Sequence, residues 1–203
     1  MTERNQKLLR KNKKNEELLA KLLPAQTADE LRARGKAVTH RFELVTILFA
    51  DIQGFTKIAE TLNPEILIDE LDKIFFYFDS VVEKYNIEKI KTIGDAYMCA
   101  GGIPVKNRTN PVEVVLAALD MQHHIEFLHQ NSGSTDSKIW NLRIGIHTGP
   151  VISGVIGKRK FSYDIWGDSV NVASRMESSG AIGKVNISSM TYDFVKDFFD
   201  CEY

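Results

Sequence analysis

The sequence predicts an α+β fold, a ferredoxin-like α/β sandwich, and three observations carry this prediction. The apolar run Leu44–Ala50 is rich in branched residues and indicates a buried central strand. Apolar residues on both sides of Gly94-Asp95 indicate a β-hairpin over residues 87–102. Apolar residues at helical spacing over 64–85 and 111–130 indicate two helices that pack on the sheet. The order strand, helix, strand, strand, helix, strand is typical of the sandwich.

The N-terminal region predicts a helical or coiled-coil segment that precedes the sandwich. Residues 5–23 have helical character, and Leu8, Leu18 and Leu22 fit a short coiled-coil seam. A solvated terminal helix is the alternative. Pro24 ends this helix, residues 25–34 indicate a second short helix, and Gly35 begins the linker into the first strand.

The remaining elements follow from the same patterns. We expect a short helix over 55–62, strands over 140–147 and 161–166, a helix from Gly167-Asp168, and a strand and helix within 185–199. Residues 149–157 are apolar and rich in glycine, which suits close packing against another surface.

Composition narrows the class of protein. A chain of 203 residues fits one domain with an extension. The sequence has no apolar run of the roughly 20 residues that a membrane span needs, and its two cysteines favour a reducing cytoplasm. Residues 1–40 hold ten Lys or Arg against five Asp or Glu, whereas the remainder holds sixteen against twenty-two. An acidic main domain argues against a nucleic-acid partner, because such proteins bind through basic surface.

Two aspartates mark the candidate site. Asp51 follows the central apolar strand, and Asp95 lies in the turn of the hairpin. A Gly-containing loop that opens a helix lies directly after Asp51. Two carboxylates at neighbouring strand ends suit a pair of Mg²⁺ ions that carry a polyphosphate. The pattern therefore predicts a nucleotide site.

Three ordered motifs give this chain a specific resemblance. Residues 49–56 read Phe-Ala-Asp-Ile-Gln-Gly-Phe-Thr, residues 91–97 read Lys-Thr-Ile-Gly-Asp-Ala-Tyr, and residues 163–177 run from Tyr-Asp-Ile-Trp-Gly-Asp to Arg-Met-Glu. With these motifs the chain resembles the class III nucleotidyl cyclases, in particular the homodimeric bacterial-type adenylyl cyclase catalytic domain. The resemblance implies a catalytic domain over residues 41–203, preceded by a signalling segment over residues 1–40 that an upstream sensor would act through.

The resemblance implies a two-metal reaction that converts ATP to 3′,5′-cyclic AMP and pyrophosphate. Asp51 and Asp95, with the backbone carbonyl of Ile52, would hold two Mg²⁺ (or Mn²⁺) ions in each active site. Backbone amides at the start of the following helix would bind phosphate oxygens, namely those of Gly54, Phe55 and Thr56.

It also assigns roles to four further residues. Arg175 would stabilise charge on the α-phosphate, and Asn171, four residues away on the same helix face, would orient the ribose. Lys91 and Asp164 would select the base: a donor and an acceptor match the pairing edge of adenine, whereas guanine presents the reverse pattern. Guanylyl members carry an acid at the Lys91 position and a small polar residue at the Asp164 position, so we expect ATP as substrate.

The resemblance implies that each active site takes its metal-binding residues, Asp51 and Asp95, from one subunit. The other subunit would supply the base-selecting and catalytic residues Lys91, Asp164, Asn171 and Arg175. This predicts a head-to-tail homodimer with shared active sites. A guanylyl cyclase and a non-catalytic nucleotide-sensing dimerisation module are the alternatives. Family domains usually continue into a further hairpin with a basic residue that contacts the triphosphate, so we expect the C-terminal end to be truncated. We expect a cytoplasmic location, either alone or as part of a larger sensor or membrane receptor.

Overall fold

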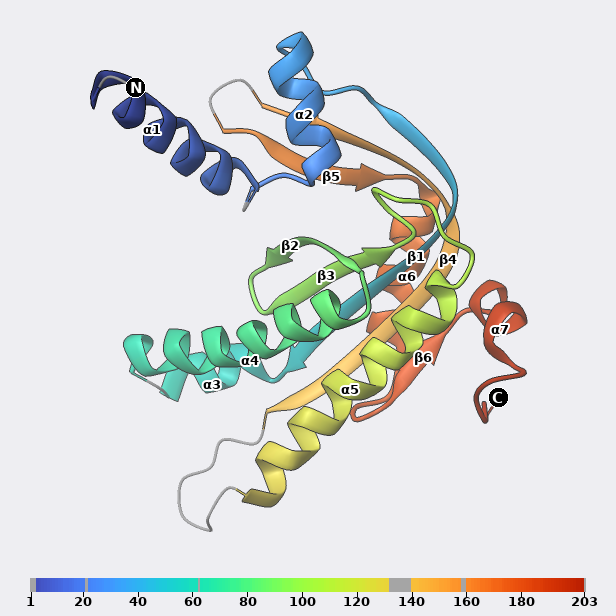
Figure 1. Cartoon of the computed structure of the whole chain (residues 1–203). Helices are drawn as coiled ribbons and strands as arrows, with labels where there is room; N and C mark the ends of the chain where they lie inside the picture. The colour runs from blue at the N-terminus through green and yellow to red at the C-terminus, as the bar shows by residue number, and fades with distance from the viewer. Residues whose placement is uncertain (1–2, 21, 62, 132–139, 158–159, 203) are drawn as a thin grey trace. The chain divides into compact units, whose positions relative to one another are not determined.

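A computed structural model describes residues 3–20, 22–61, 63–131, 140–157 and 160–202. Helices form at α1 (Glu3–Ala20), α2 (Ala25–Arg34), α3 (Phe55–Thr61), α4 (Pro64–Lys84), α5 (Asn110–Asn131), α6 (Asp168–Ser179) and α7 (Ser189–Val195). Strands form at β1 (His40–Gln53), β2 (Glu88–Ile93), β3 (Ala96–Gly101), β4 (Asn141–Ile156), β5 (Ser162–Trp166) and β6 (Val185–Ile187). The predicted mixture of helices and strands is confirmed (Figure 1).

The strands form one sheet with hydrogen-bonded order β2-β3-β1-β4-β5, and β6 pairs with β4 in parallel. β3 is antiparallel to both β2 and β1. The predicted hairpin is confirmed, because Ile93 pairs with Ala96 across the Gly94-Asp95 turn. Gly94 has φ +62°, a conformation that glycine adopts without steric cost and that suits the first central position of a tight hairpin turn.

The strand predicted over 140–147 is longer than expected. β4 continues through Gly149 and Pro150 to Ile156, so residues 149–156 are part of the sheet. A Cβ on Gly149 would lie 2.4 Å from the hydroxyl oxygen of Ser169, and this hydroxyl donates to the carbonyl of Pro150 at 2.8 Å. Glycine at position 149 therefore allows the helix that carries Ser169 to approach the strand closely. From the sequence alone, a glycine in a strand and a glycine in a loop look the same.

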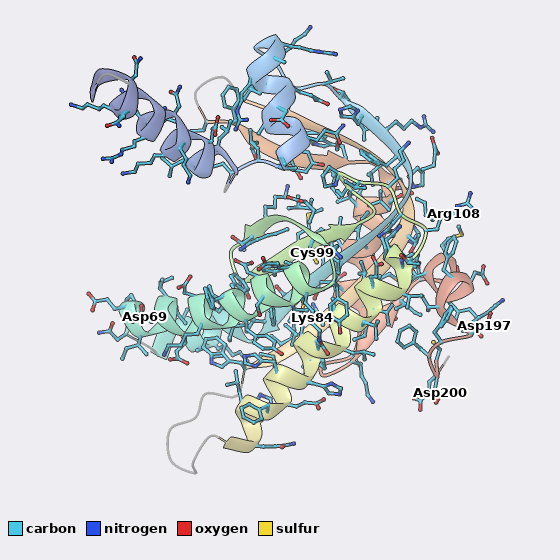
Figure 2. The ribbon with its side chains drawn as sticks, viewed as in Figure 1. Asp69, Lys84, Cys99, Arg108, Asp197 and Asp200 are labelled. Atoms are coloured by element: carbon cyan, nitrogen blue, oxygen red, sulfur yellow. The ribbon has the colours of Figure 1, made fainter. Side chains whose placement is uncertain are left out.

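Helices α4 and α5 cover one face of the sheet (Figure 1). Their apolar stripes pack with Leu48, Ala50, Tyr97 and Cys99 in one core. Lys84, near the end of α4, donates to Asp120 of α5 at 2.7 Å, and Figure 2 labels this lysine. Asn63 caps α4 by accepting from the Glu65 amide at 2.9 Å, and Pro64 occupies the first turn.

Helix α6 packs on the other face of the sheet. Leu142, Ile144 and Ile146 of β4 belong to the core under α4 and α5, so the alternate residues Arg143 and Gly145 face the opposite side. A Cβ on Gly145 would lie 1.8 Å from the backbone nitrogen of Glu177 in α6. Helix and strand therefore approach at a distance that only glycine permits.

The chain divides into two compact units: residues 1–41 with 152–165, and residues 42–151 with 166–203. In the first unit, Glu30 of α2 accepts from the Val38 amide at 2.9 Å and lies 2.7 Å from the His40 ring. The Val38 hydrogen bond is the main cause that lowers the pKa of Glu30. These contacts connect α2 to the segment that enters β1.

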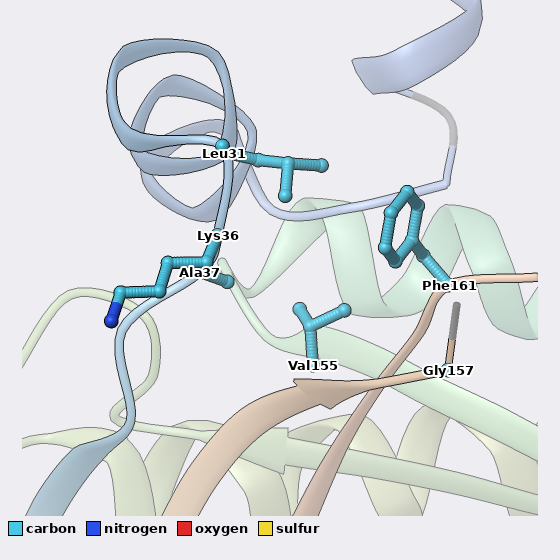
Figure 3. Close-up of a pocket in the computed structure, with 7 residues that line it drawn as sticks. Leu31, Lys36, Ala37, Val155, Gly157 and Phe161 are labelled. Carbon is cyan, nitrogen blue, oxygen red and sulfur yellow. The ribbon is translucent and has the colours of Figure 1, made fainter. Parts of the chain in front are cut away.

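The first unit also holds a pocket of about 320 Å³, shown in Figure 3. Its lining contains none of the predicted site residues and is formed by Leu31, Gly35, Lys36, Ala37, Val155, Gly157 and Phe161.

The structure has two helices in the N-terminal region, α1 and α2, and α2 ends at Gly35 in the left-handed conformation. The coiled-coil seam stays a prediction: the side chain of Leu8 lies outside the described residues, and Leu18 and Leu22 are exposed. None of the helices in the described ranges is both long enough and apolar enough to cross a lipid bilayer.

Candidate active site

Asp51 lies on β1 of the second unit, and Asp95 lies in the turn that joins β2 to β3. Asp51 pairs with Ala96 in the β1–β3 ladder, and Asp95 directly precedes Ala96 in the hairpin turn. Both side chains are partly buried. The central strand fixes the first carboxylate, and the turn fixes the second beside it.

The electrostatics of Asp51 fit a cation site. Burial and then the neighbouring charge of Asp95 raise the pKa of Asp51 to about 6, and Glu177 adds to the rise. Arg143 and a hydrogen bond from Gln53 act in the opposite direction. The negative charge near Asp51 is therefore only partly compensated by the chain itself, and a divalent cation would compensate it further.

The donor set fits Mg²⁺ or Mn²⁺. Both ions prefer oxygen ligands and are usually bound through one or two carboxylates together with substrate phosphates. Asp51 and Asp95 supply such a pair. Within the described part of the chain, no group of three or more His, Cys, Asp or Glu side chains is placed to hold a metal ion. The remaining ligands would therefore come from a backbone carbonyl, as predicted for Ile52, from water and from the nucleotide.

Three residues near Asp51 were missed by the sequence prediction. The side-chain amide of Gln53 donates to Asp51 Oδ2 at 2.6 Å and orients that oxygen. Arg143 Nε donates to Glu177 Oε1 at 2.6 Å, and both charges act on Asp51. Arg143 is a charged residue between the apolar residues Leu142 and Ile144 of the strand, which was the available signal. Glu177 had no signal apart from its helical spacing.

Lys91 lies on the same face of the sheet as Asp51. In β3, Tyr97 and Cys99 point into the core under α4 and α5, so Met98 and Ala96 point to the opposite side. Lys91 pairs with Met98, and Asp51 pairs with Ala96. Both side chains therefore project from the face that α6 also covers.

Asn171 and Arg175 are exposed on one side of α6. The buried residues of this helix are Ser169, Ala173 and Glu177, four residues apart, and they form the side that packs on the sheet. Asn171 and Arg175 lie on the reverse side, so they point away from the sheet face that carries Asp51. The two predicted sets of catalytic residues are not brought together within this single chain.

The predicted phosphate-binding residues follow Asp51 in sequence. Gly54 has φ +77° and turns the chain from β1 into α3, which begins at Phe55. Phe55 packs near Trp140, with ring centroids 6.3 Å apart, and Thr56 is exposed. The first amides of a helix lack partners within it, so they are available to a ligand.

Asp164 belongs to the first compact unit. It is buried in β5, and its Oδ1 accepts from the Ile165 amide at 2.9 Å. Its role in base selection stays a prediction.

Comparison with known proteins identifies the family. The chain belongs to the family described as the adenylate and guanylate cyclase catalytic domain, whose model matches residues 37–203. The family is the one that the three sequence motifs resemble.

Individual relatives include cyclases of both substrate classes. An adenylate cyclase of Mycobacterium tuberculosis is 38% identical over 187 residues, which cover 92% of this chain and 41% of that protein. A receptor-type guanylate cyclase of Caenorhabditis elegans is 37% identical over 194 residues, which cover 95% of this chain and 15% of that protein. The chain thus spans less than half the length of these relatives.

Solved structures agree with the fold. The crystal structure of the adenylyl cyclase CyaB from P. aeruginosa has a TM-score of 0.74 and 33% identity, over 81% of this chain and 85% of that one. Because adenylyl and guanylyl cyclases are about equally similar, the choice of purine has to be argued from the residues of this chain.

Proposed function

We propose that this protein is an adenylyl cyclase that converts ATP to 3′,5′-cyclic AMP and pyrophosphate. The observation that carries the proposal is the pair of carboxylates, Asp51 near the end of β1 and Asp95 in the turn between β2 and β3. Membership in the cyclase family gives this pair its chemical context.

The reaction forms one bond and breaks another. The ribose 3′ oxygen attacks the α-phosphorus, the bond from that phosphorus to the α–β bridging oxygen breaks, and pyrophosphate leaves with the electron pair. The 3′ hydroxyl proton passes to solvent, so no side chain has to serve as general base. Two bound divalent ions would supply Lewis-acid chemistry, lowering the pKa of the 3′ hydroxyl and neutralising phosphate charge.

The residues of the chain bind and orient the participants. Asp51 and Asp95, with the Ile52 carbonyl, would hold the ions, and Gln53 fixes the orientation of the Asp51 carboxylate by its hydrogen bond at 2.6 Å. Arg143 provides positive charge near Asp51, where the negatively charged triphosphate would bind. The amides of residues 54–56 would donate to phosphate oxygens.

The choice of ATP rests on Lys91 and Asp164. A lysine can only donate and an ionised aspartate can only accept hydrogen bonds. Adenine offers an acceptor at N1 and a donor at its 6-amino group, which match this pair. Guanine would leave buried polar groups mispaired, which can cost a factor on the order of 10⁴ in selectivity.

We infer that the active site is shared between two copies of the chain. Asp51 and Asp95 lie at the sheet, whereas Asn171 and Arg175 point away from it on the outer side of α6. A symmetric pair of chains would bring the outer side of one α6 to the metal-binding carboxylates of the other and would form two equivalent sites. Arg175 would then stabilise charge on the α-phosphate, and Asn171 would orient the ribose.

A guanylyl cyclase is the second candidate, because a guanylate cyclase relative is as similar as an adenylate cyclase relative. One experiment decides between them. Product formation is measured from ATP and from GTP in parallel, with Mg²⁺ and with Mn²⁺, at several protein concentrations.

We expect cyclic AMP from ATP, little product from GTP, and a specific activity that rises with protein concentration. Cyclic GMP from GTP as the main product would overturn the choice of purine and leave the fold and metal site intact. Absence of product under every condition would contradict the cyclase proposal and favour a nucleotide-sensing module.

The variant Lys91→Glu with Asp164→Ser is the matched test of base selection. It reverses the hydrogen-bonding polarity at both positions and should raise the preference for GTP over ATP. An unchanged preference would show that other residues select the purine.

A further inference from the structure

The carboxylate of Asp79 connects helix α4 to both strands of the hairpin. The hydroxyl of Tyr97 in β3 donates to Asp79 Oδ1 at 2.6 Å. Lys89 Nζ of β2 donates to Asp79 Oδ2 at 2.9 Å, and it lies 5.1 Å from the centroid of the Tyr97 ring. One helix residue therefore holds a side chain from each strand, in the region of β3 where Figure 2 labels Cys99.

The hairpin contains a bulge between Lys89 and Lys91. Lys89 pairs with Cys99, but Lys91 pairs with Met98, so Ile90 is an extra residue in β2. In a regular strand, residues two apart face the same side. Here Cys99 belongs to the core under α4 and α5, whereas Met98 faces the other side of the sheet. The bulge therefore directs Lys89 toward α4. It directs Lys91 to the opposite face, which also carries Asp51.

The position of β2 makes this arrangement sensitive to register. Among the strands of the described residues, β2 is terminal in the sheet and has β3 as its one neighbour. A slip of one residue would reverse the face of every side chain in β2, including Lys91. Since β2 has only one neighbouring strand, contacts from α4 are an independent means of fixing its register.

The contribution of these contacts to global stability is small. The side chains of Lys89 and Asp79 are 37% and 45% exposed, and an ion pair so open to water adds little to the stability of a fold. Tyr97, by contrast, is fully buried among Phe75 and Phe78, and burial raises the pKa of its hydroxyl, which stays a neutral donor. The contacts fix local geometry more than they stabilise the whole molecule.

We propose that Asp79 is a positioning residue that holds the Ile90 bulge in register through Lys89 and Tyr97, and thereby directs Lys91 toward the purine. The proposal rests on the proposed function, because Lys91 selects a base only in a nucleotide site. Asp79, Lys89 and Tyr97 need not touch substrate.

The first test does not depend on catalysis. Lys89→Met keeps the long side chain and removes the charge. Lys73→Met is the matched control, since Lys73 on α4 pairs with Glu70 at 2.6 Å in the same helix. Amide hydrogen exchange is measured over residues 88–98 in the full chain. We expect exchange at least about tenfold faster in Lys89→Met than in the control, with a thermal midpoint within a few degrees of wild type. Equal exchange in the two variants would overturn the proposal.

The second test measures selectivity as the ratio of kcat/KM for ATP to that for GTP. We expect Lys89→Met to lower this ratio about tenfold, Lys89→Arg to restore most of it, and Lys73→Met to leave it unchanged. In a Lys91→Ala background, Lys89→Met should cause no further loss, because it acts through Lys91.

Losses that multiply in the double variant would show that Lys89 acts independently of Lys91 and would overturn the proposal. Lack of activity in the wild-type chain would count against the proposed function instead, and hydrogen exchange would then decide whether the contact of Lys89 with Asp79 fixes the hairpin.

Discussion

Arg143 of β4 donates to Glu177 of α6 at 2.6 Å, and this ion pair lies beside Gly145, where strand and helix approach closely. The side chains are only 21% and 11% exposed, so the pair is largely removed from water. Both charges act on Asp51, with opposite signs. The ion pair that connects α6 to the sheet is therefore also part of the electrostatic environment of the candidate metal site.

Removal of one member of this pair should lower the free energy of unfolding more than removal of both. Arg143→Met leaves the Glu177 carboxylate buried without its cation, and we expect a loss of about 3 kcal/mol in the free energy of unfolding. The double variant with Glu177→Met should recover at least half of that loss, because no unpaired charge remains. Urea unfolding of the three proteins measures the difference. A double variant less stable than Arg143→Met would contradict the claim that the unpaired carboxylate of Glu177 causes the loss.

The carboxylate pair should reduce stability in the absence of metal. Asp51 is partly buried and is repelled by Asp95, so Asp51→Asn should raise the unfolding free energy by about 1 kcal/mol, a value reduced for solvent screening. The same variant should lose catalysis and the stabilisation that added Mg²⁺ gives to the wild type. Thermal unfolding with a chelator and with Mg²⁺ checks both parts, with Glu60→Gln as an exposed control on α3. Mg²⁺ stabilisation that persists in Asp51→Asn would place the ion elsewhere.

The elements that position these aspartates could be predicted because strong local signals mark them. The apolar run before Asp51 and the Gly94-Asp95 turn required no tertiary information, and the structure has a strand and a hairpin there. The bulge at Ile90 had a weaker signal: Ile87, Ile90 and Ile93 are spaced by three, which an alternating strand does not produce. Interpreted as a bulge, that spacing would have indicated the reversal of faces between Lys89 and Lys91.

Glu88 should make stability depend on pH. Burial raises the pKa of Glu88 from 4.5 to about 7. Because the folded state binds this proton more tightly than the unfolded state, the stability it contributes is present below pH 4.5 and is lost as pH rises through 7. Glu88→Gln should therefore be more stable than wild type at pH 8, by about 2 kcal/mol, and nearly equal to it at pH 4.5.

The measurement is the difference in unfolding free energy between Glu88→Gln and wild type at several pH values. Glu83→Gln, at an exposed position of α4, is the control and should show no such trend. A difference that stays constant from pH 4.5 to 8 would contradict a raised pKa for Glu88.

Other features depended on contacts between distant segments and could not be predicted locally. The ion pair of Arg143 with Glu177 joins residues 34 positions apart, and the contact of Asp79 with Tyr97 joins a helix to a strand. The close approach of Gly149 in β4 to Ser169 in α6 likewise joins distant segments. Sequence patterns report the period and ends of an element, whereas these features depend on which elements become neighbours.

Mixing two inactive variants should restore activity if the site is shared. Asp95→Ala removes a metal ligand at the hairpin, and Arg175→Ala removes a cation on the outer side of α6. Each homodimer would carry the same defect in both sites, whereas a mixed dimer would contain one site with neither defect. At equal concentrations half of the dimers are mixed, so we expect roughly a quarter of wild-type activity by this statistical argument. An Asp51→Ala and Asp95→Ala mixture is the control and should stay inactive, because both defects fall in the same half of the site. If the mixture of Asp95→Ala and Arg175→Ala stays as inactive as either variant alone, under conditions where mixed dimers form, each chain carries a complete site of its own.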